Sequence, residues 1–217
     1  MIVSVGAIAT PSGEGQLGLA AEAPLSDALA VRLQSGLMMG GGIKLQDIQL
    51  TAPILLLNKG SWTGRLTPGF TLPLGSTAPA LGISPAATGS VDPLLSAQIV
   101  GGSAWVVSGR ISARMPLVPG LDDARQGLSG AAEISGARRL DRGAVWVGSS
   151  LVQQYPGETT LELNEVAGVA GALWNVGKQT ALAVRVRVPV WSPNIAYPIA
   201  VGLEVRQVLG KRPEAAH

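Results

Sequence analysis

The chain has 217 residues, of which 47% are hydrophobic and only 14% are charged, and its formal net charge is +2. Soluble domains carry about 25% charged residues, so this chain is short of the polar surface that a water-exposed fold needs. Its 29 glycines and 15 prolines argue against a helical bundle, because both residues destabilise helix interiors. The high hydrophobic content also excludes a disordered chain.

Two residue types are scarce enough to exclude whole classes of chemistry. The chain has no cysteine, and its only histidine is the last residue, His217. Disulfides, thiolate metal sites, cysteine nucleophiles and histidine general bases are therefore not expected. No run of Lys or Arg marks a surface for nucleic acid. The longest charge-free stretch, Leu66–Val91, contains four prolines and cannot form a membrane-spanning helix.

Alternation of apolar and polar residues runs through most of the chain and predicts β-strands. In Leu182–Val190, Leu and Val occupy every second position and Ala, Arg and Pro lie between them. The pattern predicts an all-β fold of about twelve strands, at residues 1–9, 16–24, 28–40, 43–57, 61–75, 93–101, 103–117, 127–140, 143–155, 160–175, 179–191 and 196–209.

The connections between these strands alternate in length, apart from a short link at Gly40–Gly42. Short polar turns are expected at 24–27, 58–61, 101–103, 141–143 and 175–179. Longer segments are expected at 10–15, 76–92, 118–126, 156–159 and 192–196. Tight turns at one end and longer loops at the other are typical of an antiparallel up-and-down transmembrane β-barrel. We expect one barrel domain over residues 1–209 and a polar C-terminal tail over 210–217.

Nearly every charge in the predicted strands falls on the face opposite the large aliphatic side chains. In a membrane barrel this face lines the lumen, because an Arg facing lipid near the midplane costs about 2–4 kcal/mol. A soluble β-sandwich would show the same alternation, but its strands more often have about five or six residues. The lumen-lining candidates are Glu22, Arg32, Arg65, Arg110, Arg114, Glu133, Arg139, Arg185, Arg187, Glu204 and Arg206.

Aromatic residues concentrate near the predicted strand ends, where amphipathic rings would meet the two membrane–water interfaces. Strict alternation places Trp191 on the same face as Arg185 and Arg187, unless Pro189 marks a β-bulge. The expected aromatic girdle consists of Trp62, Trp105, Trp146, Tyr155, Trp174, Trp191 and Tyr197.

Two segments carry a resemblance to a known family. Gly89–Leu95 reads Gly-Ser-Val-Asp-Pro-Leu-Leu, which resembles the Gly-x-x-Asp-Pro strand entry of outer-membrane proteins of the MetA pathway of phenol degradation. Val188–Gly202, with its Val-Pro-Val-Trp and Tyr-Pro, is similar to the last hairpin of such transporter-like barrels. The resemblance covers the second half of the chain. It implies a Gram-negative outer-membrane barrel that assists uptake of small, often hydrophobic compounds, and it brings no catalytic residues.

Both ends of the chain depart from that family pattern. The opening residues Met-Ile-Val-Ser-Val-Gly show no basic region followed by an apolar one, so no signal peptide is visible. The last predicted strand ends at Gln207–Leu209 without the terminal aromatic residue that such barrels commonly carry. The expected location is nevertheless the outer membrane of a Gram-negative bacterium.

The sequence leaves three functional hypotheses open. The first is an outer-membrane channel or transporter for small molecules, hydrophobic ones included, whose Arg/Glu interior forms either an anion-favouring wall or a salt-bridge lattice that closes the lumen. The second is a soluble β-sandwich binding module. The third and weakest is an outer-membrane enzyme, since no Gly-x-Ser-x-Gly elbow is present. We expect membrane lipid and a small-molecule permeant as partners, and no enzyme activity, cofactor, metal or nucleic acid.

Overall fold

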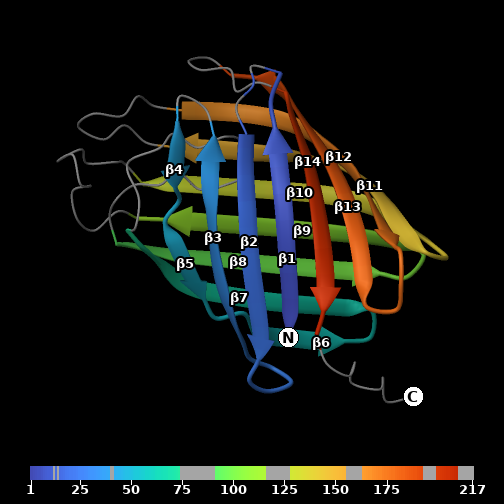
Figure 1. Cartoon of the computed structure of the whole chain (residues 1–217). Coiled ribbons are helices and arrows are strands. Elements are labelled where there is room, and N and C mark those ends of the chain that lie inside the picture. The colour runs from blue at the N-terminus through green and yellow to red at the C-terminus, as the bar shows by residue number, and fades with distance from the viewer. Residues whose placement is uncertain are drawn as a thin grey trace.

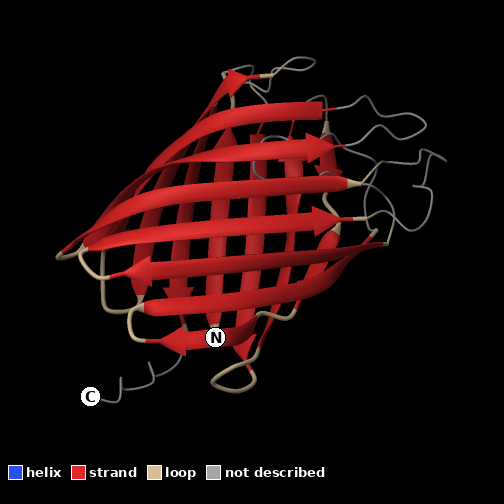
Figure 2. Ribbon diagram, turned by 180° about the vertical axis from the view of Figure 1, so that it is seen from behind, coloured by secondary structure: helices blue, strands red, loops and turns tan. Residues whose placement is uncertain are grey.

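The alternating segments form one antiparallel sheet that closes into a barrel (Figures 1 and 2). The computed structural model describes residues 1–11, 13, 15–39, 42–73, 91–115, 128–154, 163–192 and 199–209. Within these ranges each strand pairs with its neighbours in the ring, and the pairings of β1 with β14 and of β2 with β3 close it. The described residues contain no helix that is long and apolar enough to cross a membrane.

The strands match the predicted segments closely in position. They are β1 Ile2–Ala9, β2 Gly15–Pro24, β3 Ala30–Met39, β4 Ile43–Leu45, β5 Ile48–Thr51, β6 Ile54–Lys59, β7 Trp62–Leu72, β8 Asp92–Gly102, β9 Trp105–Arg114, β10 Ser129–Leu140, β11 Gly143–Gln154, β12 Leu163–Asn175, β13 Thr180–Trp191 and β14 Ala200–Val208. The short strands β4, β5 and β6 together occupy the single place between β3 and β7. The ring therefore has twelve strand positions, and the prediction of an antiparallel twelve-stranded barrel is confirmed.

The prediction of one continuous strand over 43–57 is wrong. β4 pairs with β3 in one register and β5 pairs with it in a register shifted by one residue, so the Gln46–Asp47 segment between them forms a bulge. The second break, between β5 and β6, contains Pro53, which has no N–H to donate to a sheet ladder. This place in the wall is therefore built from three short pieces.

The two ends of the barrel differ in the length of their connections. At one end, called the turn end below, short turns join β2 to β3, β6 to β7, β8 to β9, β10 to β11 and β12 to β13. Both described chain ends lie there, and the N–H of Leu209 donates a hydrogen bond of 2.8 Å to the carbonyl of Met1. The strand ends that the longer connections join lie at the opposite end, called the loop end below.

The outer face of the barrel is strongly apolar. Val107, Ile134 and Val147 point outward from three successive strands and are between 52% and 67% exposed. Their sequence neighbours point inward, as the two-residue period of a strand requires. An outward apolar face around a closed ring matches the lipid-facing band of a membrane barrel.

Candidate functional site: the inner wall of the barrel

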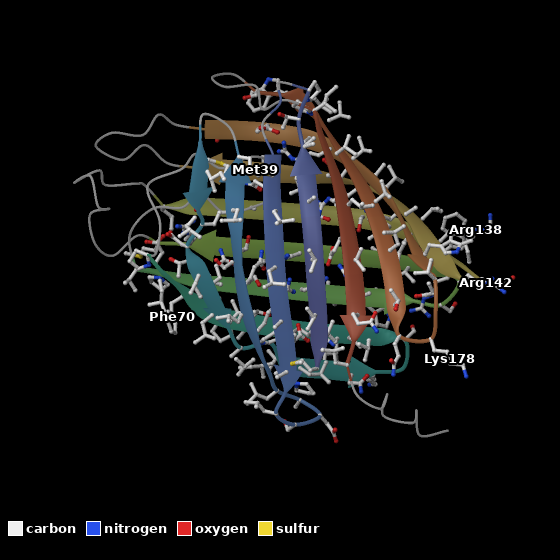
Figure 3. All side chains as sticks on the ribbon, in the orientation of Figure 1. Met39, Phe70, Arg138, Arg142 and Lys178 are labelled. Atoms are coloured by element: carbon white, nitrogen blue, oxygen red, sulfur yellow. The ribbon has the colours of Figure 1, made fainter. Side chains whose placement is uncertain are left out.

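The strand register places all eleven lumen-lining candidates on the inner face, opposite the exposed aliphatic residues. On β9, for example, Arg110 pairs with Gln98 and Glu133, whereas the adjacent Ile111 pairs with Ala97 and Ala132 on the outer face. Figure 3 shows the side chains of both faces on the ribbon. The candidates so placed are Glu22, Arg32, Arg65, Arg110, Arg114, Glu133, Arg139, Arg185, Arg187, Glu204 and Arg206.

Five of these residues form a group near the middle of the barrel, called the central belt below: Arg32, Arg110, Glu133, Arg185 and Glu204. Arg185 Nη2 lies 2.9 Å from Glu133 Oε2, although two strands separate β13 from β10 in the sheet. The Arg110 charge interacts with Glu133, Arg32 and Arg185. The Glu204 charge also interacts with Arg32. The charges of residues on β3, β9, β10, β13 and β14 therefore act on one another across the lumen.

The central belt is hydrated and carries excess positive charge. The side chains of Arg185 and Glu133 are 29% and 32% exposed, and Arg110 is exposed. An ion pair with this much contact to water contributes about 0–1 kcal/mol to stability. Its three arginines and two glutamates give the belt a net charge of +1.

Further arginines line the wall between the belt and the turn end. Arg206 Nε donates to Glu204 Oε1 at 2.8 Å, and its Nη2 donates to Glu204 Oε2 at 3.2 Å. Arg65 and Arg139 also face inward and are exposed. Between the central belt and the turn end, with the belt included, the described inward side chains comprise six arginines and three glutamates.

Two other ion pairs, called the loop-side pairs below, lie on the inner face nearer the loop end. Arg114 Nε donates to Asp92 Oδ2 at 2.6 Å, joining the first residue of β8 to the last residue of β9. Arg187 forms an ion pair with Glu165, and the two side chains are 1% and 0% exposed. Charges buried this deeply are tolerated only when they are paired.

The acidic members of the loop-side pairs were not among the sequence candidates. Asp92 precedes a proline and falls at the end of the connecting segment predicted over 76–92. Glu165 lies on β12, where both faces carry small or apolar residues, so alternation did not reveal which face is inner. Asp47, at the bulge between β4 and β5, is also buried and was missed. A charged residue inside an otherwise apolar strand is the only sequence signal that could have identified Glu165.

The tryptophans divide between the two faces. Trp62, Trp105 and Trp174 point outward near the turn end. Trp191 pairs with Val166 on the outer face, because the register of β12 and β13 shifts by one residue beside Pro189. Outside the described residues lie Tyr155 and Tyr197. Outward-facing Phe70, which was not predicted for the girdle, lies near the loop end.

Trp146 differs from the prediction, because it points into the barrel. It shares the inner face of β11 with Gly148 and Ser150, and its ring covers Gly171 on β12. A Cβ at Gly171 would overlap the Trp146 ring, so the pair is an aromatic side chain packed over a neighbouring-strand glycine. The described residues contain no cluster of His, Cys, Asp or Glu that could hold a metal ion.

The fold is similar to those of solved outer-membrane barrels. The structure titled COG4313 outer membrane channel from Pseudomonas putida F1 superimposes with a TM-score of 0.71 at 18% identity, covering 96% of this chain and 94% of that one. The NanC porin gives a TM-score of 0.68 at 6% identity, with 95% and 100% of the chains covered. The KdgM porin gives 0.63 at 10% identity, with 97% and 100% covered. No protein-family model and no curated protein sequence matches the chain. At these identities the likeness establishes the fold alone.

Proposed function

We propose that this barrel is an outer-membrane channel or transporter of a Gram-negative bacterium, and that it passes small solutes with a preference for anions. The observation that carries the proposal is the hydrated, arginine-rich inner wall, with the central belt at its middle. The apolar outer face supports the membrane location, because it would be costly to expose in water. The neighbours titled channel or porin share the fold that this function requires.

The preference for anions follows from the unequal charge of the inner wall. Fixed charges that line a lumen interact more strongly with permeating ions than charges at an open surface, because less water screens them. Six arginines against three glutamates between the belt and the turn end attract anions and repel cations. The wall therefore supports polar or anionic permeants better than the hydrophobic compounds that the sequence resemblance implies.

We also propose that this chain is related to the outer-membrane barrels of the MetA pathway of phenol degradation, as the sequence resemblance implies. The Asp-Pro strand entry that suggested it has a structural role here, since Asp92 begins β8 and forms an ion pair with Arg114 on β9. The other resembling segment, Val188–Gly202, is described only up to residue 192 and again from residue 199.

The first test is refolding of the purified chain in detergent, followed by comparison of unheated and boiled samples on an SDS gel. A heat-dependent mobility shift is expected for a closed membrane barrel. A barrel that stays folded and soluble without detergent would contradict the proposed membrane location.

The second test measures ion selectivity in a planar bilayer. We expect a reversal potential across a KCl gradient that indicates preferred chloride passage. Arg110→Gln, which removes a charge from the central belt, should reduce this preference, and the Arg32→Gln/Arg110→Gln/Arg185→Gln triple variant should abolish it. Arg138→Gln is the matched control, because Arg138 carries the same charge on the outer face. A folded barrel that shows no conductance would contradict the channel and indicate a closed structural protein.

A further inference from the structure

Positively charged side chains gather on the outside of the barrel at the turn end. Arg138 lies on β10 and faces outward, in register with Trp105 of β9. Arg142 lies in the turn that follows β10, and Lys178 lies in the turn between β12 and β13. Figure 3 shows all three at the same edge of the barrel, projecting from its wall. All three are exposed. They are called the basic rim below.

The geometry of Arg138 places the basic rim at the border of the apolar band. The Arg138 guanidinium carbon lies 5.6 Å from the centroid of the Trp105 ring, and Trp105 is 68% exposed. A cation over an indole face gains attraction while its N–H groups stay directed outward. Outward tryptophans mark the membrane–water interface, so Arg138 lies at headgroup depth rather than among acyl chains.

Two consecutive arginines of β10 point to opposite faces of the barrel wall. Arg138 points outward, whereas Arg139 points into the lumen. The basic rim holds three cations, and Asp141 in the β10–β11 turn is the acidic residue beside them. The rim therefore keeps excess positive charge that the Trp105 ring does not neutralise.

We propose that the basic rim binds the phosphate headgroup of an anionic glycerophospholipid in the leaflet at the turn end. The proposal rests on the membrane location proposed above. The guanidinium groups of Arg138 and Arg142 can each donate paired hydrogen bonds to phosphate oxygens. Lys178 would add a third positive charge near the same headgroup. Basic residues close to a membrane surface attract anionic lipid, with about a five-fold gain in affinity for each charge. The adjacent apolar wall would hold the acyl chains of the same lipid.

The test is native mass spectrometry of the full chain refolded in detergent micelles. The micelles are supplied with equal amounts of phosphatidylglycerol and phosphatidylcholine that carry the same acyl chains. For the unmodified chain, we expect phosphatidylglycerol to be retained at least about five-fold over phosphatidylcholine. The Arg138→Gln/Arg142→Gln variant, which keeps only Lys178 of the basic rim, should show a preference at least about five-fold weaker. Arg139→Gln, which removes the same charge from the inner face, should keep it.

Three results with the variants and the competitor would overturn the lipid site even where the unmodified chain prefers phosphatidylglycerol. They are an undiminished preference in Arg138→Gln/Arg142→Gln, an equal loss in Arg139→Gln, and displacement of phosphatidylglycerol by millimolar glycerol phosphate, which would indicate a general phosphate site. The heat-dependent gel shift is recorded on the same samples. Its absence would mean that the membrane barrel itself has failed, whereas a shift without lipid preference would reject the basic rim alone.

Discussion

Arg185 and Arg187 lie two residues apart on β13, face the same way and each pair with a glutamate, yet their surroundings differ. The Arg185–Glu133 side chains are 29% and 32% exposed, whereas those of Arg187 and Glu165 are 1% and 0% exposed. A hydrated pair adds little to stability and leaves its charge available to a solute. A dry pair must stay intact, because either partner alone would be an uncompensated buried charge.

The same contrast extends along the inner wall. Toward the turn end, Arg65, Arg139 and Arg206 are exposed on the inner face. Nearer the loop end, the Asp92 side chain is fully buried in its pair with Arg114. The same arginine chemistry is therefore exposed in one part of the wall, where the proposed permeant would meet it, and buried in the other part, where it joins neighbouring strands.

The largest effect on stability is expected when the buried Arg187–Glu165 ion pair, called the dry pair below, is broken. Glu165→Gln leaves the buried Arg187 charge without its carboxylate, so we expect the free energy of unfolding to fall by about 3–5 kcal/mol. Urea unfolding of the refolded barrel in micelles measures this loss. Glu133→Gln, the same substitution in the wet pair, should change the free energy of unfolding by less than about 1 kcal/mol. Equal losses in the two variants would show that burial does not separate the pairs.

A second prediction tests how tightly the wet part of the wall is packed. Gly171→Ala places a Cβ against the Trp146 ring and the Val184 carbonyl oxygen, so we expect a loss of about 1–3 kcal/mol in the free energy of unfolding. The control is Gly168→Ala on the same strand, whose Cβ would meet Val188 and Val190 only at ordinary contact distances. A neutral Gly171→Ala variant would mean that Trp146 moves freely in a wide lumen.

These packing details also show how far the sequence could predict the molecule. β9 and β13 were predictable because one face is aliphatic and the other carries arginines, which fixes both the strand and its inner side. β12 offers small or apolar residues on both faces, so Glu165 could not be assigned to the lumen.

Other differences between the sequence-based predictions and the structure depend on strand register, which a single sequence does not specify. Position near a strand end suggests that Trp146 belongs to the girdle, but the register of β11 with β10 and β12 places it on the inner face. The bulge beside Pro189 was expected as a condition for Trp191 to face lipid, and the register shift meets that condition. Pro53 was a visible signal for the break between β5 and β6, whereas the bulge at Gln46–Asp47 was not.

A third prediction concerns a polar residue in the buried part of the wall. Gln16 is 2% exposed, faces inward between Ile8 and Met38, and neither atom of its amide has a hydrogen-bond partner within the described part of the chain. Gln16→Leu removes this unsatisfied amide from an apolar setting, so we expect a gain of about 1 kcal/mol in the free energy of unfolding. Urea unfolding measures the gain. A loss of stability would indicate that Gln16 binds water or a solute there.

The smallest change in stability should accompany a clear change in selectivity. Glu133→Gln leaves the three arginines of the central belt facing Glu204 alone, and the hydrated belt tolerates the lost pair at a cost of less than about 1 kcal/mol. The added net positive charge should raise the preference for chloride in bilayer reversal-potential measurements. Lower salt should enlarge the effect, because the Debye length grows from about 10 Å at 0.1 M to about 30 Å at 0.01 M.

Glu165→Gln removes the same charge from the dry pair and provides the matched comparison for selectivity. Where that variant refolds, its chloride preference should change less than that of Glu133→Gln, because Glu165 and Arg187 have almost no contact with the solution through which ions pass. An equal shift would show that permeating ions experience both pairs alike. Water would then have to reach the Arg187–Glu165 pair during conduction. The two pairs would therefore not differ in hydration while ions pass.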